Sequence, residues 1–321
     1  MEGKREILRK KNPGGIAMPY PLLMKTMIDF KDLTIEDKPR IGELICASGC
    51  HGADYNFANI FMWRHTYKPR LAYISERIIV FMPEGGGLYA YPKGRGKLEH
   101  AIAEMRSDAR ERGIRFQMRG LTERVLEEFL PIYGNEFDII EDRDNADYIY
   151  TVDKLCNLRG RHLSSKRNHI KHFERNGDWN FTRITAENLS IARDFTEEFY
   201  DIKSDPSLEP EAKAIGEMFK YYEELEFYGG MLSQNGKPVA FTAGTRLDDA
   251  TFDTHFEKAL PNVEAAYTMV NREFARMIHE LLPDIEYFNR EEDIGIEGLR
   301  RSKESYRPDK LLMKYTVIEK E

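Results

Sequence analysis

The sequence predicts a mixed α/β fold (α+β in its local order) in which one succession of helices and strands occurs twice. In each half, three short strands rich in β-branched or aromatic residues follow a predicted helix and are separated by turn residues. Each half then continues with a helix, a strand, a second helix and a final strand. This order is typical of α+β and mixed α/β domains, and its repetition predicts two tandem domains.

We place the junction between the halves near residues 151–157. The chain of 321 residues then divides into a lead-in over 1–28, a first domain over 29–152 and a second domain over 153–321. The lead-in is polar or rich in Pro and Gly, so we expect it to be flexible.

In the first half, turn residues mark where the elements end. Ser75-Glu76-Arg77 and Glu84-Gly85-Gly86-Gly87 separate the three strands, and Gly113 ends the helix that follows them. The predicted elements are a helix over 39–47, strands over 71–73, 78–81 and 88–91, a helix over 97–111, a strand over 114–118, a helix over 123–130 and a strand over 137–141.

In the second half, Gln234-Asn235-Gly236-Lys237 is a strong hairpin signal, because Asn-Gly suits a tight two-residue turn. Asp248-Asp249 marks the next turn. The predicted elements are a strand over 179–184, helices over 186–203 and 210–225, strands over 228–233, 238–247 and 251–256, a helix over 264–281, a strand over 285–288, a helix over 295–306 and a strand over 311–318.

The composition is that of a globular protein with substantial cores, with 41% hydrophobic and 32% charged residues. The net charge of -7 excludes a generic binder of polyanions, so a nucleic-acid contact requires a local basic surface. No apolar run approaches the roughly 18 residues that span a bilayer. Cys46, Cys50 and Cys156 give no disulfide framework, and we expect a cytoplasmic location. Cys46 and Cys50 stand before His51 without a fourth ligand at a recognisable spacing, so no metal site is predicted.

A polar turn follows the strand predicted over 285–288, at the kind of strand end where α/β proteins place ligands. Its residues Asn289, Glu291, Glu292 and Asp293 are candidates to bind the ammonium group of an acceptor or of an aminoacyl group. The competing interpretation is structural, because Asp293 can cap the helix that follows.

A basic segment runs from Lys154 to Arg175. On a helix, Arg167, Lys171 and Arg175 fall at i, i+4 and i+8 and form one cationic stripe, with Arg161 and Lys166 nearby. Such a stripe can neutralise phosphates of tRNA, of a coenzyme or of a lipid headgroup. The alternative is a solvated helix face.

The strand over Thr251–Glu257 carries the candidate catalytic groups. Strict alternation places Phe252, Thr254 and Phe256 on one face, and Asp253, His255 and Glu257 on the other. We expect His255 to act as a general base, with Glu257 or Asp253 orienting its ring. Tyr306 is a candidate proton donor to a leaving group, although a Tyr at a helix end also suits packing.

Several stretches carry a resemblance to a known family. They are Gly160-Arg161-His162-Leu163-Ser164-Ser165-Lys166-Arg167-Asn168, Thr254-His255-Phe256-Glu257-Lys258-Ala259, Asn271-Arg272-Glu273-Phe274-Ala275, the stretch from Asn289 to Arg300, and Ser305-Tyr306-Arg307-Pro308. With the element order, they resemble the phosphatidylglycerol lysyltransferase C-terminal domain family over roughly residues 30–318. The resemblance implies two tandem acyl-CoA N-acyltransferase domains of the GCN5-related (GNAT-like) fold, and transfer of an aminoacyl group from tRNA to an amine or hydroxyl.

Acyl-CoA is the alternative donor. Acetyltransferases of this fold carry a glycine-rich loop that directs backbone N–H groups at a pyrophosphate, but Ala259-Leu260-Pro261-Asn262-Val263-Glu264-Ala265 has no glycine. In the first half, Lys93, Gly94, Arg95 and Gly96 offer a Gly-x-Gly loop with cations, which suits an anion or is a basic turn. No cofactor is firmly implied.

The leading hypothesis is therefore an aminoacyltransferase that uses aminoacyl-tRNA as co-substrate and a small or lipid-like acceptor. The alternatives are an acyl-CoA-dependent N-acyltransferase and a non-catalytic binding module on the same fold.

Overall fold

The computed structural model describes residues 27–48 and 52–321. The predicted lead-in over 1–28 lies almost entirely outside the described residues. So do Cys50, His51 and the side chain of Cys46, the residues weighed above as metal ligands.

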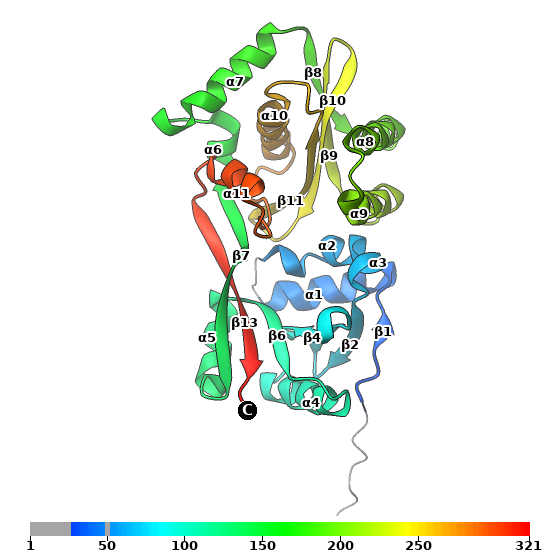
Figure 1. Ribbon diagram of the computed structural model, residues 1–321, viewed down its shortest axis with the longest axis vertical. Coiled ribbons are helices and arrows are strands. Elements are labelled where there is room, and N and C mark those ends of the chain that lie inside the picture. Colours follow the sequence, from blue (N-terminus) through cyan, green and yellow to red (C-terminus); the bar gives the residue numbers. More distant parts are fainter. Residues whose placement is uncertain (1–26, 49–51) are drawn as a thin grey trace, which may run out of the picture.

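One structural unit occurs in both halves of the chain (Figure 1). In the first half, strands β2 (Arg70–Ile74), β3 (Arg77–Met82) and β4 (Leu88–Ala90) are antiparallel, and helix α4 (Leu98–Glu111) leads to β6 (Gln117–Thr122), which is parallel to β4. In the second half, β9 (Tyr228–Gln234), β10 (Lys237–Arg246) and β11 (Thr251–Ala259) are antiparallel, and helix α10 (Ala266–Leu281) leads to β12 (Tyr287–Asn289), which is parallel to β11. The predicted fold class, a mixed α/β protein with two tandem GNAT-like domains, is confirmed.

Two long strands join the halves into a single 13-stranded sheet. Strand β7 (Phe137–Thr151) pairs with β12 through residues 149–151, and β13 (Lys310–Glu319) lies between β6 and β7. The C-terminal strand thus pairs with strands that precede residue 152, and the division of the chain at that residue remains a prediction.

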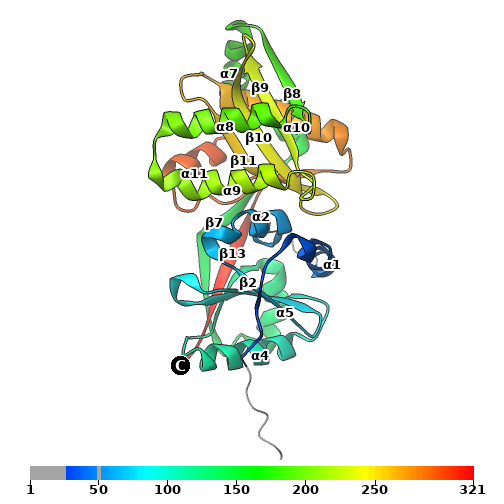
Figure 2. The same ribbon diagram turned by 90° about the vertical axis from the view of Figure 1, so that its right-hand side faces the viewer.

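Helices cover both faces of the second half of the sheet (Figure 2). Helix α10 lies on one face, which we call the α10 face, with α6 (Val152–Asn157) and α7 (Ser164–Arg175). Helices α8 (Leu189–Lys203) and α9 (Glu209–Lys220) cover the other, the α9 face. Helix α2 (Phe57–Met62) of the first half packs against α9, where the rings of Phe61 and Tyr221 lie 5.0 Å apart. First-half residues therefore reach the α9 face of the second half.

The remaining elements complete the two halves. They are β1 (Lys31–Asp32), α1 (Lys38–Ser48), α3 (Arg64–Tyr67), β5 (Lys93–Gly94), α5 (Glu123–Tyr133), β8 (Trp179–Ile184), α11 (Glu297–Glu304) and short 3-10 helices, among them η2 (Ala53–Tyr55).

The largest difference from the prediction is the length of β7, which continues ten residues beyond the predicted end at 141. Its segment Glu141–Asn145 is charged and shows no alternation, so no local pattern predicts a strand. Pairing with β13, which is distant in sequence, extends it.

A candidate active site between the two halves

A β-bulge in β11 determines which face each candidate residue occupies. Ala243 pairs with Phe256 and the next residue of β10, Gly244, pairs with Thr254, so His255 is the extra residue of the bulge. A Cβ on Gly244 would lie 2.1 Å from the backbone oxygen of Asp253. Glycine therefore permits the close approach of β10 and β11 here.

The bulge makes the expected alternation wrong. Phe252 packs in the core of the α10 face, whereas Phe256 packs in the core that includes α8 and α9 residues. Asp253 and His255 remain together on the α9 face, but Glu257 points to the α10 face, where it accepts hydrogen bonds from Asn271 and Arg290. Glu257 is therefore not the group that orients His255.

Strands β11 and β12 pair over only three residues each, from Thr251 to Asp253 and from Tyr287 to Asn289. Beyond this point β11 continues to Ala259, whereas the chain after Asn289 enters the turn over 290–296. Successive turn residues bridge the divergence on opposite faces: Arg290 reaches Glu257 and Glu291 reaches His255. The two polar clusters thus flank the same divergence from two sides.

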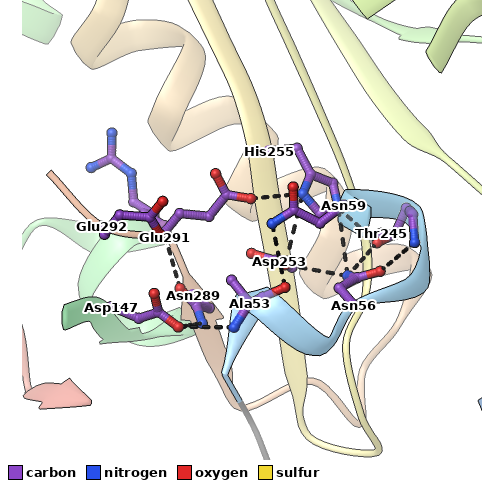
Figure 3. Close-up of polar contacts among 12 residues, drawn as sticks. Ala53, Asn56, Asn59, Asp147, Thr245, Asp253, His255, Asn289, Glu291 and Glu292 are labelled. Carbon is purple, nitrogen blue, oxygen red and sulfur yellow. Dashed lines mark hydrogen bonds and ion pairs between the residues drawn. The ribbon is translucent and has the colours of Figure 1, made fainter. Parts of the chain in front are cut away.

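On the α9 face, His255 lies in a closed network of polar side chains (Figure 3). Its Nδ1 is 2.8 Å from a carboxylate oxygen of Glu291, and its Nε2 is 2.9 Å from the hydroxyl of Thr245. Asp253 is the more distant carboxylate, 3.7 Å from Nδ1. A carboxylate at Nδ1 selects the tautomer in which Nδ1–H donates and Nε2 carries a lone pair, which is the basic form of the ring.

Asn56, from the first half, completes this network. Its Nδ2 donates to Thr245 Oγ1 at 2.8 Å and to Asp253 Oδ2 at 3.2 Å. Its Oδ1 accepts from the N–H of Ala58 as the N-cap of α2, which fixes the orientation of the amide. The site therefore requires residues from both halves of the chain.

Asp253, His255 and Glu291 each offer one ligand atom, and these atoms lie within 4.8 Å of one another. A cation bound among them would face the Asn56 amide, which presents hydrogens rather than a lone pair toward Asp253. The arrangement fits a hydrogen-bonded network better than a metal centre.

Burial favours the neutral form of Asp253, whose side chain is fully buried. Burial raises the pKa of Asp253 well above its usual range, and the nearby carboxylates of Glu291 and Asp147 raise it further. The direction of this shift fits the uncharged partner of Asp253, because its hydrogen-bond donor is the neutral amide of Asn56.

The acidic turn divides into internal and partly exposed residues. Asn289 and Asp293 are fully buried. Asn289 donates to Asp147 and accepts from the N–H of Glu291, and Asp293 is bonded to Arg143, Arg300 and Tyr148. Internal partners already bind both side chains, which favours the structural interpretation of these two residues; their role as ligands of an acceptor stays a prediction.

Glu291 and Glu292 reach solvent in part, with side chains 19% and 25% exposed, although Glu291 also contacts His255. Burial raises the pKa of Glu292 to about 7, against the attraction of Lys314, whose Nζ lies 3.6 Å away. Lys303 fixes the turn by donating to the carbonyls of Arg290, at 2.6 Å, and Glu292.

On the α10 face, Glu257 lies among polar groups. Arg290 donates to both of its carboxylate oxygens, at 3.1 and 3.2 Å, and Asn271 donates to one at 3.1 Å. Tyr306 is 3% exposed, and burial raises its pKa to about 12, so its hydroxyl keeps its proton at neutral pH. Lys166 Nζ lies 4.0 Å from the centre of the Tyr306 ring, and burial lowers its pKa to about 8.

The basic residues of α7 do not form one uniform stripe. Arg167 Nη1 donates to the carbonyls of Leu158 and Gly160, so this guanidinium holds the loop before the helix. Arg161, Lys171 and Arg175 are exposed and available to a phosphate. Lys166 belongs to the cluster around Glu257.

The Gly-x-Gly loop of the first half has a packing role. A Cβ on Gly94 would lie 2.0 Å from the carbonyl oxygen of Glu76, and one on Gly96 would lie 1.4 Å from that of Ser75. The N–H of Arg95 is bonded to the same Glu76 carbonyl, and Lys93 is buried over the Tyr55 ring. Because neighbouring backbone lies against both glycines, the structure favours the basic-turn interpretation of this loop over an anion site.

Sequence reasoning missed several residues of both clusters. Asn56, Thr245 and Arg290 are single polar residues, and Asn271 lies in a stretch that carries the family resemblance without being a candidate site residue there. Asn56 and Thr245 join His255, and Asn271 and Arg290 join Glu257, only in the folded chain. One local signal was available: a lone glycine in a predicted strand, here Gly244, indicates a bulge or a close backbone approach.

The fold and the site thus define a protein with two GNAT-like domains and with a polar network around His255 that includes residues of both halves. The family model for phosphatidylglycerol lysyltransferase, C-terminal, matches residues 48–318, and the chain belongs to this family. No curated protein matches the chain.

Several solved structures resemble it. A conserved protein of unknown function from Bacteroides thetaiotaomicron VPI-5482 is 34% identical, with 92% of this chain and 100% of that chain covered and a TM-score of 0.85. The C-terminal domain of a putative lysylphosphatidylglycerol synthetase from Agrobacterium fabrum is 14% identical, with coverages of 89% and 92% and a TM-score of 0.62. L-PGS from Bacillus licheniformis is 16% identical, with coverages of 78% and 84% and a TM-score of 0.55. The last two show likeness of fold.

Within residues 27–48 and 52–321, no helix has the length and apolar character required to cross a membrane.

Proposed function

We propose that this protein transfers an aminoacyl group from aminoacyl-tRNA to the amine or hydroxyl of a small or lipid-like acceptor. The observation that carries the proposal is the His255 ring, held between Glu291 at Nδ1 and the Thr245 hydroxyl at Nε2. A positioned imidazole with a carboxylate partner is the arrangement that general-base catalysis of acyl transfer requires. Family membership supports aminoacyl transfer as the reaction class.

In the proposed reaction, the acceptor nitrogen or oxygen attacks the carbonyl carbon of the aminoacyl ester. The acceptor proton passes to Nε2 of His255, either directly or through the Thr245 hydroxyl, which gives its own proton to Nε2. The ester bond to the tRNA ribose oxygen breaks, and that oxygen leaves with the proton. Glu291 stabilises the imidazolium that exists between the two transfers.

The donor phosphates are assigned to the exposed cations of η4 (Arg161–Leu163) and α7. Arg161, Lys171 and Arg175 lie on one exposed segment of a chain whose net charge is -7, so their positive charge is a local property. The partly exposed Glu291 and Glu292 are assigned to the cationic end of the acceptor or of the aminoacyl group.

Acyl-CoA receives less support as the donor. The first-half glycine loop is packed against Ser75 and Glu76, and the segment before α10 contains no glycine. Neither segment therefore matches the open, glycine-rich loop that binds a pyrophosphate.

Substitution of His255 and Glu291 tests the site. We expect His255→Gln to lower the transfer rate about 100-fold or more, because general-base catalysis contributes on that scale. Glu291→Gln should lower kcat, because it removes the negative charge that favours the basic tautomer of His255, and should raise KM, because Glu291 is also assigned to the cationic end of a substrate. Transfer from a pool of labelled aminoacyl-tRNA to candidate acceptors gives the rates.

His100→Gln is the matched control, because His100 is exposed and lies on α4 of the first half. The assignment of the base fails if His255→Gln and His100→Gln transfer equally well.

A further inference from the structure

Three buried polar atoms without hydrogen-bond partners meet around Glu257 on the α10 face. They are Oγ1 of Thr242, Oδ1 of Asn271 and Nη1 of Arg290. These residues are 0%, 5% and 9% exposed. Buried polar groups are nearly always hydrogen-bonded, and leaving one unpaired is costly.

All three residues are direct neighbours of Glu257. Asn271 and Arg290 donate to its carboxylate, and Thr242 is its partner across β10 and β11. Cross-strand partners present their side chains on the same face, so Thr242 points toward the same group as the other two. We call these three residues, Glu257 and the nearby Lys166 the Glu257 cluster.

The cluster has an excess of positive charge and a route to solvent. Glu257 compensates Arg290, and Lys166, which lies near both, has no salt bridge within the described residues. The Glu257 side chain is 13% exposed and Lys166 is partly exposed, so the cluster is not sealed.

The unpaired atoms define the chemistry of the missing partner. Arg290 Nη1 and Lys166 Nζ are donors, and they require a carbonyl or carboxylate oxygen. Asn271 Oδ1 is an acceptor and requires an N–H group, and the Thr242 hydroxyl can serve either. An α-amino-acid group satisfies the donors and the acceptor together, because its ammonium is on the carbon atom next to the carbonyl group.

We propose that the Glu257 cluster binds the α-amino-acid portion of the substrate, with its ammonium at Asn271, Thr242 and Glu257 and its carbonyl or carboxylate oxygen at Arg290 and Lys166. The choice of ligand rests on the proposed function. Because Arg290 and Glu291 are adjacent in the turn, a group bound at the cluster lies across the strand divergence from His255. The donor then approaches from the α10 face, where α7 presents its cations, and the acceptor from the α9 face.

Thr242→Val is the variant that separates binding from folding. It replaces an unpaired hydroxyl with a methyl of the same shape, so the protein should be as stable as the wild type or more stable. Binding of an α-amino-acid amide, the probe used below, should nevertheless weaken about five- to tenfold, which is the effect of one lost hydrogen bond. Tyr222→Phe is the matched control, because its hydroxyl is also buried and unpaired but lies in the other core.

Calorimetric titration with the amides of the 20 L-amino acids measures binding, and thermal unfolding measures stability. We expect at least one amide to bind, its α-hydroxy analogue to bind about tenfold more weakly, and Tyr222→Phe to bind like the wild type. The proposal is overturned if no amide binds, if Thr242→Val binds unchanged, or if inorganic phosphate binds and amino-acid amides do not. If the proposal fails while His255→Gln still abolishes transfer, the proposed function stands; if the wild type transfers nothing, both fail.

Discussion

At the scale of single residues, the turn after β12 shows how adjacent acids acquire different properties. The Glu291 carboxylate accepts a hydrogen bond from Nδ1 of His255, whereas Glu292 faces the buried ammonium of Lys314. Asp293 is held by two arginines, a tyrosine and a backbone N–H, and these hydrogen bonds keep its pKa low despite the opposing effect of burial. Three consecutive carboxylates therefore serve three different roles.

The raised pKa of Glu292 predicts a specific pH dependence of the free energy of unfolding. Its pKa is about 7 in the folded protein and about 4.3 in the unfolded chain, so the folded state binds the extra proton between these values. Its contribution to the free energy of unfolding is therefore highest below pH 4, falls as the pH rises to 7 and is constant above.

Glu292→Gln removes this titration. Because a quarter of the side chain reaches solvent, we expect the variant to gain about 2 kcal/mol relative to wild type between pH 4.5 and 7.5, less than the full linkage value. Urea denaturation at a series of pH values measures the difference. Parallel stability curves for the two proteins would contradict the raised pKa.

At the scale of elements, the bulge in β11 is the feature that builds the site. It turns Glu257 away from His255 and gives each face of the strand its own polar cluster. The positions of the strands follow from local patterns, because β-branched and aromatic runs and the Asn-Gly turn are local signals. The bulge follows from local patterns only in part: the lone Gly244 indicates a bulge or a close approach, but the bulged residue depends on the contact of Gly244 with the backbone of the neighbouring strand.

Gly244→Ala tests the importance of the bulge. A methyl group 2.1 Å from a backbone oxygen must displace one of the strands, so we expect a loss of about 1–3 kcal/mol or more in the free energy of unfolding. Transfer activity should fall with it, because Asp253 and His255 would move. Gly216→Ala in α9 is the control: its Cβ would meet nothing within 4 Å, and we expect a gain of about 0.5–1 kcal/mol. Equal effects of the two substitutions on stability and activity would argue against a required bulge.

At the scale of the whole molecule, a buried ion pair joins four distant segments. Lys314 of β13 lies 2.7 Å from both Asp147 of β7 and Asp54 of η2, and Asp147 accepts hydrogen bonds from Ala53 and Asn289. No sequence signal identifies Lys314, which occupies the centre of an otherwise ordinary strand pattern. Its role follows only from the insertion of β13 between strands of the first half.

Lys314→Met should therefore destabilise the protein by about 3–5 kcal/mol, because it leaves Asp147 buried without its cation. Lys310→Met is the control in the same strand; its ion pair with Glu123 is exposed and should contribute less than about 1 kcal/mol. Urea denaturation at pH 7 compares them. A Lys314→Met protein as stable as Lys310→Met would show that this ion pair does not hold the halves together.

The identity of the donor is the most direct test of function for the whole molecule. We would measure binding of total aminoacyl-tRNA, and of acetyl-CoA in parallel, across a salt series. For tRNA, affinity should fall steeply with salt, and Lys171→Glu/Arg175→Glu should weaken binding and reduce the salt slope by about 2, whereas Arg110→Glu/Arg124→Glu on the first-half helices should not. Salt-insensitive binding of acetyl-CoA without affinity for tRNA would contradict aminoacyl transfer.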